Sequence, residues 1–205
     1  MSNDKKTDLT PIARLYEDSL EHHGVKPQGV GWRDEGSHRL RFGKLVSVIE
    51  AGDAVIINDL GCGYGALYDY LFKRDVKVSL FRGYDISVKM LEEARARVPD
   101  GEFLIGSFLD KTADYSFASG IFNVRLQESE EKWRTHVELT LDNLFKYSTR
   151  GFAFNLLSTY VDYREPHLFY GDPLHFFDLC KRRYSPRVSL LHDYPLFEWT
   201  IVVRR

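Results

Sequence analysis

Three glycines stand close together at Gly61, Gly63 and Gly65, directly after an apolar run and directly before a helical stretch. Glycine lets the backbone turn tightly and bring its N–H groups, together with the helix N-terminus, against a ligand. Asp85 follows the next apolar run, where its carboxylate can accept hydrogen bonds from both hydroxyls of a ribose. Glycine turns also occur for purely structural reasons, but with this distant acid in place the pattern favours a nucleoside-binding site.

The charge beside these glycines bears on which nucleoside is bound. Gly61, Gly63 and Ala66 also satisfy the dinucleotide fingerprint, so a nicotinamide dinucleotide is one candidate. Its pyrophosphate would bring two negative charges toward Asp59, which would oppose them unless the side chain turned away. S-adenosylmethionine has no phosphate and carries an ammonium and a sulfonium, for which a nearby acid is favourable. Asp59 therefore favours the sulfonium cofactor.

The elements that position these residues alternate between β-rich and helical from residue 54 onward. Such alternation is typical of parallel strands joined by right-handed helical crossovers. The last two β-rich runs are separated only by residues 192–196, too short for a crossover helix, so they should pair antiparallel. We expect one α/β domain with a Rossmann-like, doubly wound, mostly parallel seven-stranded sheet and a terminal antiparallel strand. The expected strands lie at residues 54–57, 80–84, 103–105, 115–122, 151–157, 187–191 and 197–203.

The residues ahead of the first strand are expected to form a helical cap, 1–52, over a cofactor-binding core, 53–205. Thr10 is a suitable N-cap and Pro11 suits the first helical position, so the first helix should begin there and end before Gly24. A glycine-rich loop follows, and a second helix is predicted over residues 37–50.

Composition and charge exclude several classes of protein. The 205 residues include 28 basic and 30 acidic ones, which gives a formal net charge of -2. The chain therefore lacks the excess of basic residues that is expected of a protein that binds nucleic acid. No apolar run approaches the roughly 20 residues that span a bilayer, and no apolar segment of a secretory signal follows the polar N-terminus. Cys62 and Cys180 match no metal-binding spacing or disulfide framework, so we expect no metal and a reducing cytoplasmic compartment.

Asp59, the three glycines and Asp85, together with the terminal strand pair, resemble the motifs of class I S-adenosylmethionine-dependent methyltransferases over about residues 53–205. The resemblance implies that the glycine turn holds the methionine part of the cofactor, that Asp85 holds the ribose and that Ile86 packs on the adenine. Family members often have an acid after strand three that bonds the adenine amino group, whereas this chain has Ser107, which offers only a weaker neutral hydrogen bond.

The expected cofactor contacts extend from the glycine turn to the ends of strands three and four and to the cap. Arg41 of the cap could pair with the cofactor carboxylate, although a packed surface helix explains this residue equally well. The cofactor-binding residues predicted are Asp59, Gly61, Cys62, Gly63, Asp85, Ile86, Ser107, Phe108, Ser119, Trp32 and Arg41.

The acceptor should lie beyond the carboxyl ends of the strands, which places residues 119–123 and 158–164 around the transfer site. Members that methylate nucleobase amino groups often carry Pro-Pro-Tyr after an Asn or Asp there, whereas Asn123 is followed by Val124, which argues against such acceptors. The predicted substrate contacts are Asn123, Tyr160, Tyr163 and Arg164, and the candidate catalytic residues are Tyr163 and His192.

Structural alternatives exist for several of these side chains. Tyr160 and Tyr163 are equally consistent with surface aromatics, and a turn histidine such as His192 more often hydrogen-bonds its neighbours. His136 stands one turn from Trp133 on a predicted helix and is interpreted as a histidine at the edge of the core. The sequence as a whole predicts a methyltransferase acting on a small-molecule acceptor. A NAD-dependent oxidoreductase and a non-catalytic nucleoside-binding module are the alternatives.

Overall fold

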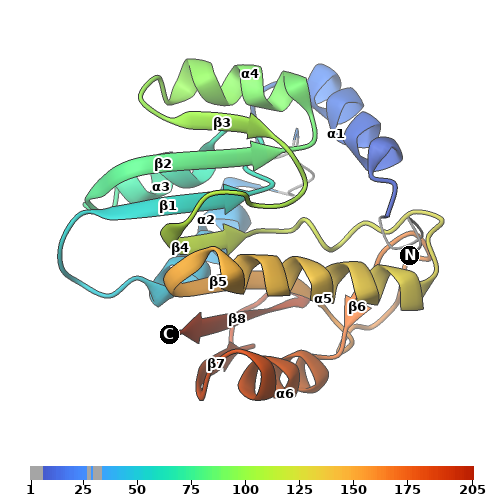
Figure 1. Cartoon of the computed structure of the whole chain (residues 1–205). Helices are drawn as coiled ribbons and strands as arrows, with labels where there is room; N and C mark the ends of the chain where they lie inside the picture. The colour runs from blue at the N-terminus through green and yellow to red at the C-terminus, as the bar shows by residue number, and fades with distance from the viewer. Residues whose placement is uncertain (1–6, 27–28, 30–33) are drawn as a thin grey trace, which may run out of the picture.

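A central mixed sheet with helices on both faces forms the body of the protein in the computed structural model, which describes residues 7–26, 29 and 34–205 (Figure 1). The strands are β1 (Val55–Leu60), β2 (Val78–Asp85), β3 (Glu102–Ile105), β4 (Ala113–Ala118), β5 (Ser148–Ser158), β6 (Tyr170–Gly171), β7 (Arg187–Leu191) and β8 (Glu198–Arg204). The helices are α1 (Thr10–His23), α2 (Glu35–Leu45), α3 (Ala66–Phe72), α4 (Val88–Arg97), α5 (Glu130–Lys146) and α6 (Pro173–Arg183), with a 3₁₀ turn at Val46–Val48.

The strand order β3-β2-β1-β4-β5-β8-β7 confirms the predicted Rossmann-like sheet. Strands β1 to β5 pair parallel, whereas β8 lies antiparallel between β5 and β7. The two-residue β6, which the sequence pattern is too short to reveal, adds an eighth strand beside the end of β5. From β1 the next strands, β2 and β3, are added on one side of the sheet, whereas from β4 the next strand, β5, is added on the other side. The order of the strands therefore reverses between β1 and β4. In open α/β sheets, ligands bind at this switch point, beyond the carboxyl ends of the strands.

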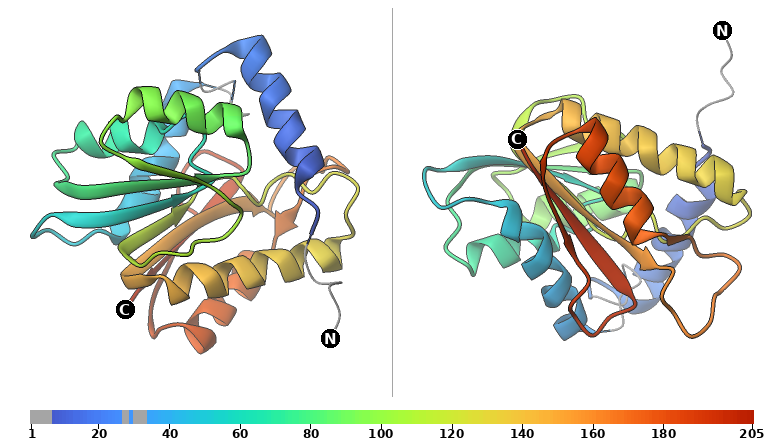
Figure 2. Two further views of the ribbon diagram at one scale, coloured as in Figure 1. Left: turned by 45° about the horizontal axis from the view of Figure 1, so that its top comes forward. Right: turned by 90° about the horizontal axis from the view of Figure 1, so that it is seen from below.

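Helices cover both faces of the sheet, as the views in Figure 2 show. An apolar layer holds them against each face. On one face, α2 and α3 cover a core that includes Leu45 and Leu71, and on the other, α5 and α6 cover a core that includes Trp133 and Phe176. Many aromatic residues of the last third of the chain belong to this second core, where Trp199 packs against Phe176 with ring centroids 5.5 Å apart. None of the helices in the described part of the chain is long and apolar enough to cross a membrane.

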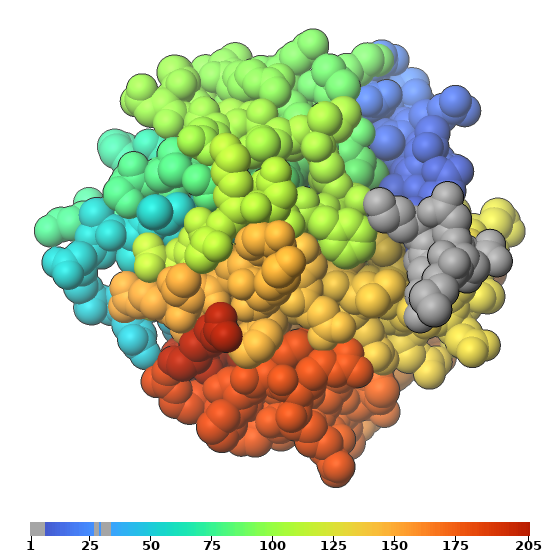
Figure 3. All heavy atoms as spheres, in the orientation of Figure 1, coloured from blue at the N-terminus to red at the C-terminus, as the bar shows by residue number. Residues whose placement is uncertain are grey.

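Helix α1 lies beside α4 at one side of the sheet (Figures 1 and 3). The hydroxyl of Ser87, the N-cap of α4, donates to Glu17 Oε1 at 2.9 Å, and Lys89 of α4 forms an ion pair with Glu21. These contacts fasten α1 over the end of β2. The helix starts at Thr10, and Gly24 ends it as predicted. Thr10 itself is not the N-cap, because Leu9 takes that position and the Asp8 carboxylate accepts the Thr10 N–H instead.

Helix α2 begins two residues earlier than the sequence predicts, directly after its capping residue. The Asp34 side chain accepts the backbone N–H of Ser37 at 2.8 Å, which satisfies one of the free donors at the helix start. The regular helix ends at Leu45 and the 3₁₀ turn continues it to Val48, so residues 49 and 50, which were predicted to be helical, lie outside the observed helix. Helix α2 packs directly on the sheet face.

Candidate active site

A pocket opens at the carboxyl ends of β1, β2 and β4, where the topology places a ligand site. It encloses about 990 Å³ of space that no atom fills, part of which is open solvent. Eight of the predicted cofactor residues line it: Asp59, Gly61, Cys62, Gly63, Asp85, Ile86, Ser107 and Ser119. The structure therefore brings the ends of four different strands to one cavity.

The glycine turn forms the floor of this pocket because its backbone adopts the left-handed region. The φ values of Gly61, Gly63 and Gly65 are 73°, 52° and 82°. Residues other than glycine rarely adopt a positive φ. The N–H groups of Gly61 and Cys62 both donate to the carbonyl oxygen of Tyr84, at 2.7 and 3.0 Å. A Cβ atom on Gly61 would lie 2.1 Å from Cγ2 of Ile121, so the turn and the residues after β4 touch without room for a side chain.

The Asp85 carboxylate is held in place by two backbone N–H groups. Oδ2 accepts from Gly63 and Oδ1 accepts from Ser87, each at 2.9 Å. Burial raises the pKa of Asp85, and these hydrogen bonds oppose that rise. Each oxygen retains a lone pair, so the carboxylate can still accept from a ligand. This geometry fits the ribose-binding role that the resemblance implies.

Asp59 is a buried carboxyl group beside the Asp85 site. Its residue is 3% exposed, and desolvation, followed by the negative charge of Asp85, raises its pKa to about 8. The group is therefore mostly protonated at neutral pH, and a cation in the pocket would favour its ionised form. Ser119 adds a second polar group here, because its Oγ is buried and has no hydrogen-bond partner among the described residues.

The cap contributes side chains that the sequence pattern did not single out. Leu9, Ile12 and Tyr16 reach the pocket from the start of α1, and His38 and Phe42 reach it from α2. Desolvation of the Tyr16 hydroxyl, with a smaller effect from Asp85, raises the pKa of this side chain to about 12. The sequence shows that Ile12 and Tyr16 lie on one face of a helix. It does not show which surface of the protein that face covers.

Helix α5 supplies the remaining wall through His136 and Thr140. His136 does lie at the edge of the core, packed against the Trp133 ring with centroids 5.0 Å apart. Burial lowers its pKa to about 4, so the imidazole is neutral at physiological pH. The same side chain also faces the pocket, which the interpretation as a core-edge residue leaves out.

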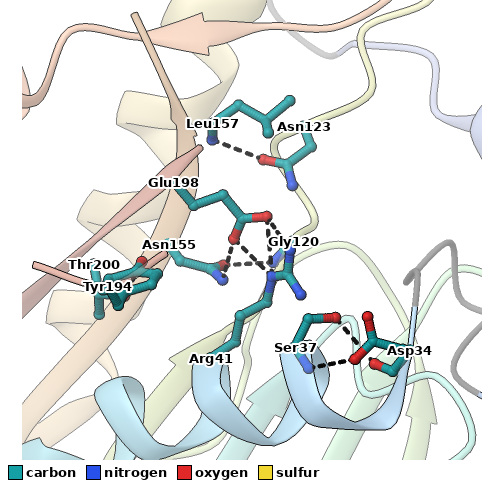
Figure 4. Close-up of polar contacts among 10 residues, drawn as sticks. All are labelled: Asp34, Ser37, Arg41, Gly120, Asn123, Asn155, Leu157, Tyr194, Glu198 and Thr200. Atoms are coloured by element: carbon teal, nitrogen blue, oxygen red, sulfur yellow. Dashed lines mark hydrogen bonds and ion pairs between the residues drawn. The ribbon is translucent and has the colours of Figure 1, made fainter. Parts of the chain in front are cut away.

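Arg41 does not line the pocket, which corrects its assignment to the cofactor carboxylate. Its Nε donates to both carboxylate oxygens of Glu198, at 2.9 and 2.8 Å, inside the protein (Figure 4). Glu198 Oε2 also accepts from Nδ2 of Asn155 at 3.1 Å, and Oδ1 of Asn155 accepts the Gly120 N–H at 2.7 Å. A buried chain of contacts thus connects α2 with the turn after β4 that lines the pocket.

Of the other two predicted cofactor contacts, Phe108 lies just outside the pocket lining and Trp32 lies outside the described residues. The Phe108 ring packs edge-on against His136, with centroids 6.2 Å apart. Phe108 therefore supports a wall residue rather than forming the wall itself.

The predicted acceptor residues lie outside the pocket lining. The Asn123 side chain is occupied, because its Oδ1 accepts the Leu157 N–H at 3.1 Å. Tyr160 and Tyr163 are 63% and 71% exposed, and Arg164 stacks over the Tyr170 ring at 5.6 Å.

His192 also lies outside the pocket lining, with its ring centroid 5.8 Å from that of Tyr160. The turn after β7 therefore lies beside the loop after β5, at the same edge of the sheet as the pocket. Neither candidate catalytic residue, Tyr163 nor His192, reaches the cavity.

Comparison with known proteins points to one family. Over 163 residues the chain is 49% identical to "Putative methyltransferase Rv1506c" of Mycobacterium tuberculosis, which covers 77% of this chain and 98% of that protein. No family model matches the chain.

The fold is similar to those of solved methyltransferases. A SAM-dependent methyltransferase of Leishmania major superposes with a TM-score of 0.62 and 15% identity, covering 98% of this chain and 87% of that one. The methyltransferase domain of bacterial CtHen1 gives a TM-score of 0.60 at 16% identity, covering 82% and 97%. Mitomycin 7-O-methyltransferase MmcR gives 0.63 at 13% identity, covering 94% of this chain and 60% of that one.

Proposed function

The chain belongs to the class I S-adenosylmethionine-dependent methyltransferases, and on that basis we propose that it transfers a methyl group to a small-molecule acceptor bound in the pocket beside residues 119–121. The observation that carries this proposal is that Asp59 and Asp85 line one cavity with the glycine turn. A positive charge would stabilise the ionised form of both acids, so the pair suits a cationic cofactor better than a pyrophosphate.

The residues present fit such a cofactor. Ser119 Oγ is a buried polar atom with no partner among the described residues, and the Asp59 carboxyl is buried in the same cavity. A ligand with hydrogen-bonding groups and a positive charge would satisfy both, since a buried polar group without a partner costs roughly 1–3 kcal/mol.

Each part of the pocket has a role toward the cofactor. The glycine turn allows close approach of the amino-acid part, and Asp59 would pair with its ammonium group. Asp85 would accept from the ribose hydroxyls with the lone pairs that Gly63 and Ser87 leave free. Ile86 and Met90 supply apolar surface for the base. When bound, S-adenosylmethionine supplies a methyl group on a sulfonium, which a nucleophile can attack in line.

The acceptor site is formed by the cap helices together with the turn after β4. Ile12 and Phe42 give apolar surface from above, and Ile121 gives it from the sheet. Such walls exclude water and hold a small molecule in position. Positioning of the acceptor is the main contribution to the rate of a methyl transfer. The catalytic residues are not assigned, since positioning alone is sufficient for an acceptor that arrives deprotonated.

Calorimetry with S-adenosylhomocysteine and with NAD tests the cofactor assignment. We expect saturable binding of S-adenosylhomocysteine and none of NAD at the same concentrations. Tight binding of NAD without binding of the sulfur compound would instead support the NAD-dependent oxidoreductase.

Methyl transfer from radiolabelled S-adenosylmethionine tests the acceptor class. The acceptors offered are a panel of small hydroxyl, amine and thiol compounds, a mixed RNA sample and a mixed protein sample. We expect label in the small-molecule fraction. Label confined to RNA or protein would overturn the small-molecule acceptor, and no transfer to any fraction would favour the non-catalytic nucleoside-binding module. The cytoplasmic compartment remains a prediction.

A further inference from the structure

His136 has the properties of a ligand-binding residue that the roles above leave unassigned. The residue is 8% exposed and lines the pocket, yet the described residues make no hydrogen bond to either of its ring nitrogens. Its ring is fixed between Trp133 and Phe108, at centroid distances of 5.0 and 6.2 Å. The ring nitrogens are not among the polar atoms sealed in the core without a partner, so they face the open cavity, where a bound ligand can reach them and supply a hydrogen-bond partner.

The order of the strands shows which part of a nucleoside His136 would meet, given the proposed function. Along the carboxyl edge the order is β3-β2-β1-β4. If Asp85 at the end of β2 holds the ribose and the glycine turn after β1 holds the amino-acid part, the base extends toward β3. Ser107 follows β3, and Phe108 beside it contacts His136. The imidazole therefore lies at the nucleobase end.

The connection from β3 to β4 explains how α5 reaches this end. Residues 106–112 connect β3 to β4 without a crossover helix. Helix α5 therefore forms the wall of the pocket that such a helix would otherwise form. The Asn143 side chain clamps the loop to α5, because its Oδ1 accepts the Leu109 N–H at 2.7 Å and its Nδ2 donates to the Leu109 carbonyl at 3.0 Å. This clamp holds Phe108, and through it the ring of His136, at a fixed position.

We propose that His136 recognises the adenine of the cofactor, with one ring nitrogen accepting a hydrogen bond from the exocyclic amino group. This contact replaces the carboxylate that the sequence lacks after β3, where Ser107 stands. A neutral imidazole has one acceptor and one donor, so it can bind an amino group without bringing a charge into an apolar wall. Thr140, one turn further along α5, donates its hydroxyl to the His136 carbonyl at 2.8 Å and leaves the ring nitrogens to the ligand.

The test combines a protein variant with a ligand that lacks the amino group. Calorimetry measures the affinities of wild type and His136→Ala for S-adenosylhomocysteine and for its 6-deamino analogue. One buried hydrogen bond corresponds to roughly a tenfold ratio of affinities. We expect wild type to prefer the amino compound by that ratio and the variant to bind both within about twofold, since the partner of the amino group is gone.

Two further variants separate recognition from packing. His38→Ala removes another histidine of the pocket, from α2, and should leave the preference for the amino compound unchanged. His136→Gln keeps a hydrogen-bond acceptor and should retain part of the preference for the amino compound. This variant also provides the test if His136→Ala folds poorly. A preference that survives in both His136 variants unchanged would overturn the role of His136. Failure of wild type to bind S-adenosylhomocysteine at all would overturn the proposed function itself.

The ring nitrogens of His136 provide a readout that is independent of affinity. In a ¹⁵N-histidine sample, we expect the signal of the accepting nitrogen to shift when S-adenosylhomocysteine binds and to shift much less with the 6-deamino analogue. Equal shifts with both ligands would contradict a contact to the amino group.

Discussion

Arg41 and Glu198 form a buried ion pair between α2 and the start of β8, with Nε of Arg41 2.9 and 2.8 Å from the two carboxylate oxygens. The pair lies beside the pocket without lining it. Through Asn155 it reaches the N–H of Gly120, so it positions the turn beside Ser119 as well as the helix that carries His38 and Phe42.

Loss of this pair should destabilise the protein strongly. Removing one partner of a buried ion pair leaves an uncompensated charge and typically costs about 3–5 kcal/mol. We expect that loss in the free energy of unfolding of Glu198→Ala, measured by urea titration. Lys44 and Asp193 form a matched surface pair from the same helix, in which the Asp193 side chain is 71% exposed. Asp193→Ala should therefore change stability little, and equal losses in both variants would contradict the positioning role.

Asp59 should contribute less to the stability of the ligand-free protein as pH rises. Its folded pKa is about 8 against an ordinary value of 3.8, so between these values this carboxyl binds more protons in the folded state than in the unfolded state. The contribution of Asp59 to the free energy of unfolding then falls from pH 4 to pH 8 and levels off above, and it is measured as the difference between wild type and Asp59→Asn. Asp59→Asn removes this dependence and should be more stable than wild type at pH 9 by at least about 1 kcal/mol.

Urea titrations at pH 5, 7 and 9 measure this effect. Asp69→Asn provides the control, because Asp69 is partly exposed and paired with Arg97, and this variant should keep the pH dependence of wild type. Parallel pH dependences of wild type and Asp59→Asn between pH 5 and pH 9 would show that Asp59 does not carry the raised pKa.

Asp85 should be essential for binding the nucleoside. Its carboxylate is fixed by the N–H groups of Gly63 and Ser87, and hydrogen bonds to charged groups contribute roughly 1.5–3 kcal/mol each. Asp85→Ala should weaken binding of S-adenosylhomocysteine at least tenfold. Asp110→Ala is the control, because Asp110 bonds the Tyr84 hydroxyl and does not line the pocket. Equal affinities in the two variants would remove the ribose assignment.

The sequence predicted the sheet and the residues that line the pocket around the glycine turn because both depend on local patterns. Strand and helix alternation defines the topology, and Gly61, Gly63 and Asp85 mark the ends of β1 and β2. Arg41 was misassigned because its partner, Glu198, stands 157 positions away, and pairing at that distance depends on the docking of α2. Tyr16 was missed for a similar reason, since contacts such as Ser87 with Glu17 decide what α1 covers.

The contact between Gly61 and Ile121 gives the sharpest test of the glycine turn. Gly61→Ala introduces two costs, a left-handed φ of 73° and a Cβ atom 2.1 Å from Cγ2 of Ile121. Backbone strain alone costs an alanine roughly 1–2 kcal/mol in this region. The clash must in addition move the turn or the residues after β4, and both line the pocket. We expect Gly61→Ala to lose binding of S-adenosylhomocysteine by calorimetry as well as stability in urea.

Gly24 separates strain from clash, because its φ is 68° and a Cβ there meets no atom of the described residues within 4 Å. Gly24→Ala should lose only the strain energy and retain binding. Combining Gly61→Ala with Ile121→Ala removes Cγ2, so the double variant should recover part of the affinity that Gly61→Ala loses. If Gly61→Ala instead behaves like Gly24→Ala, the two segments have room to separate, and close contact between the turn and the end of β4 is not required for the site.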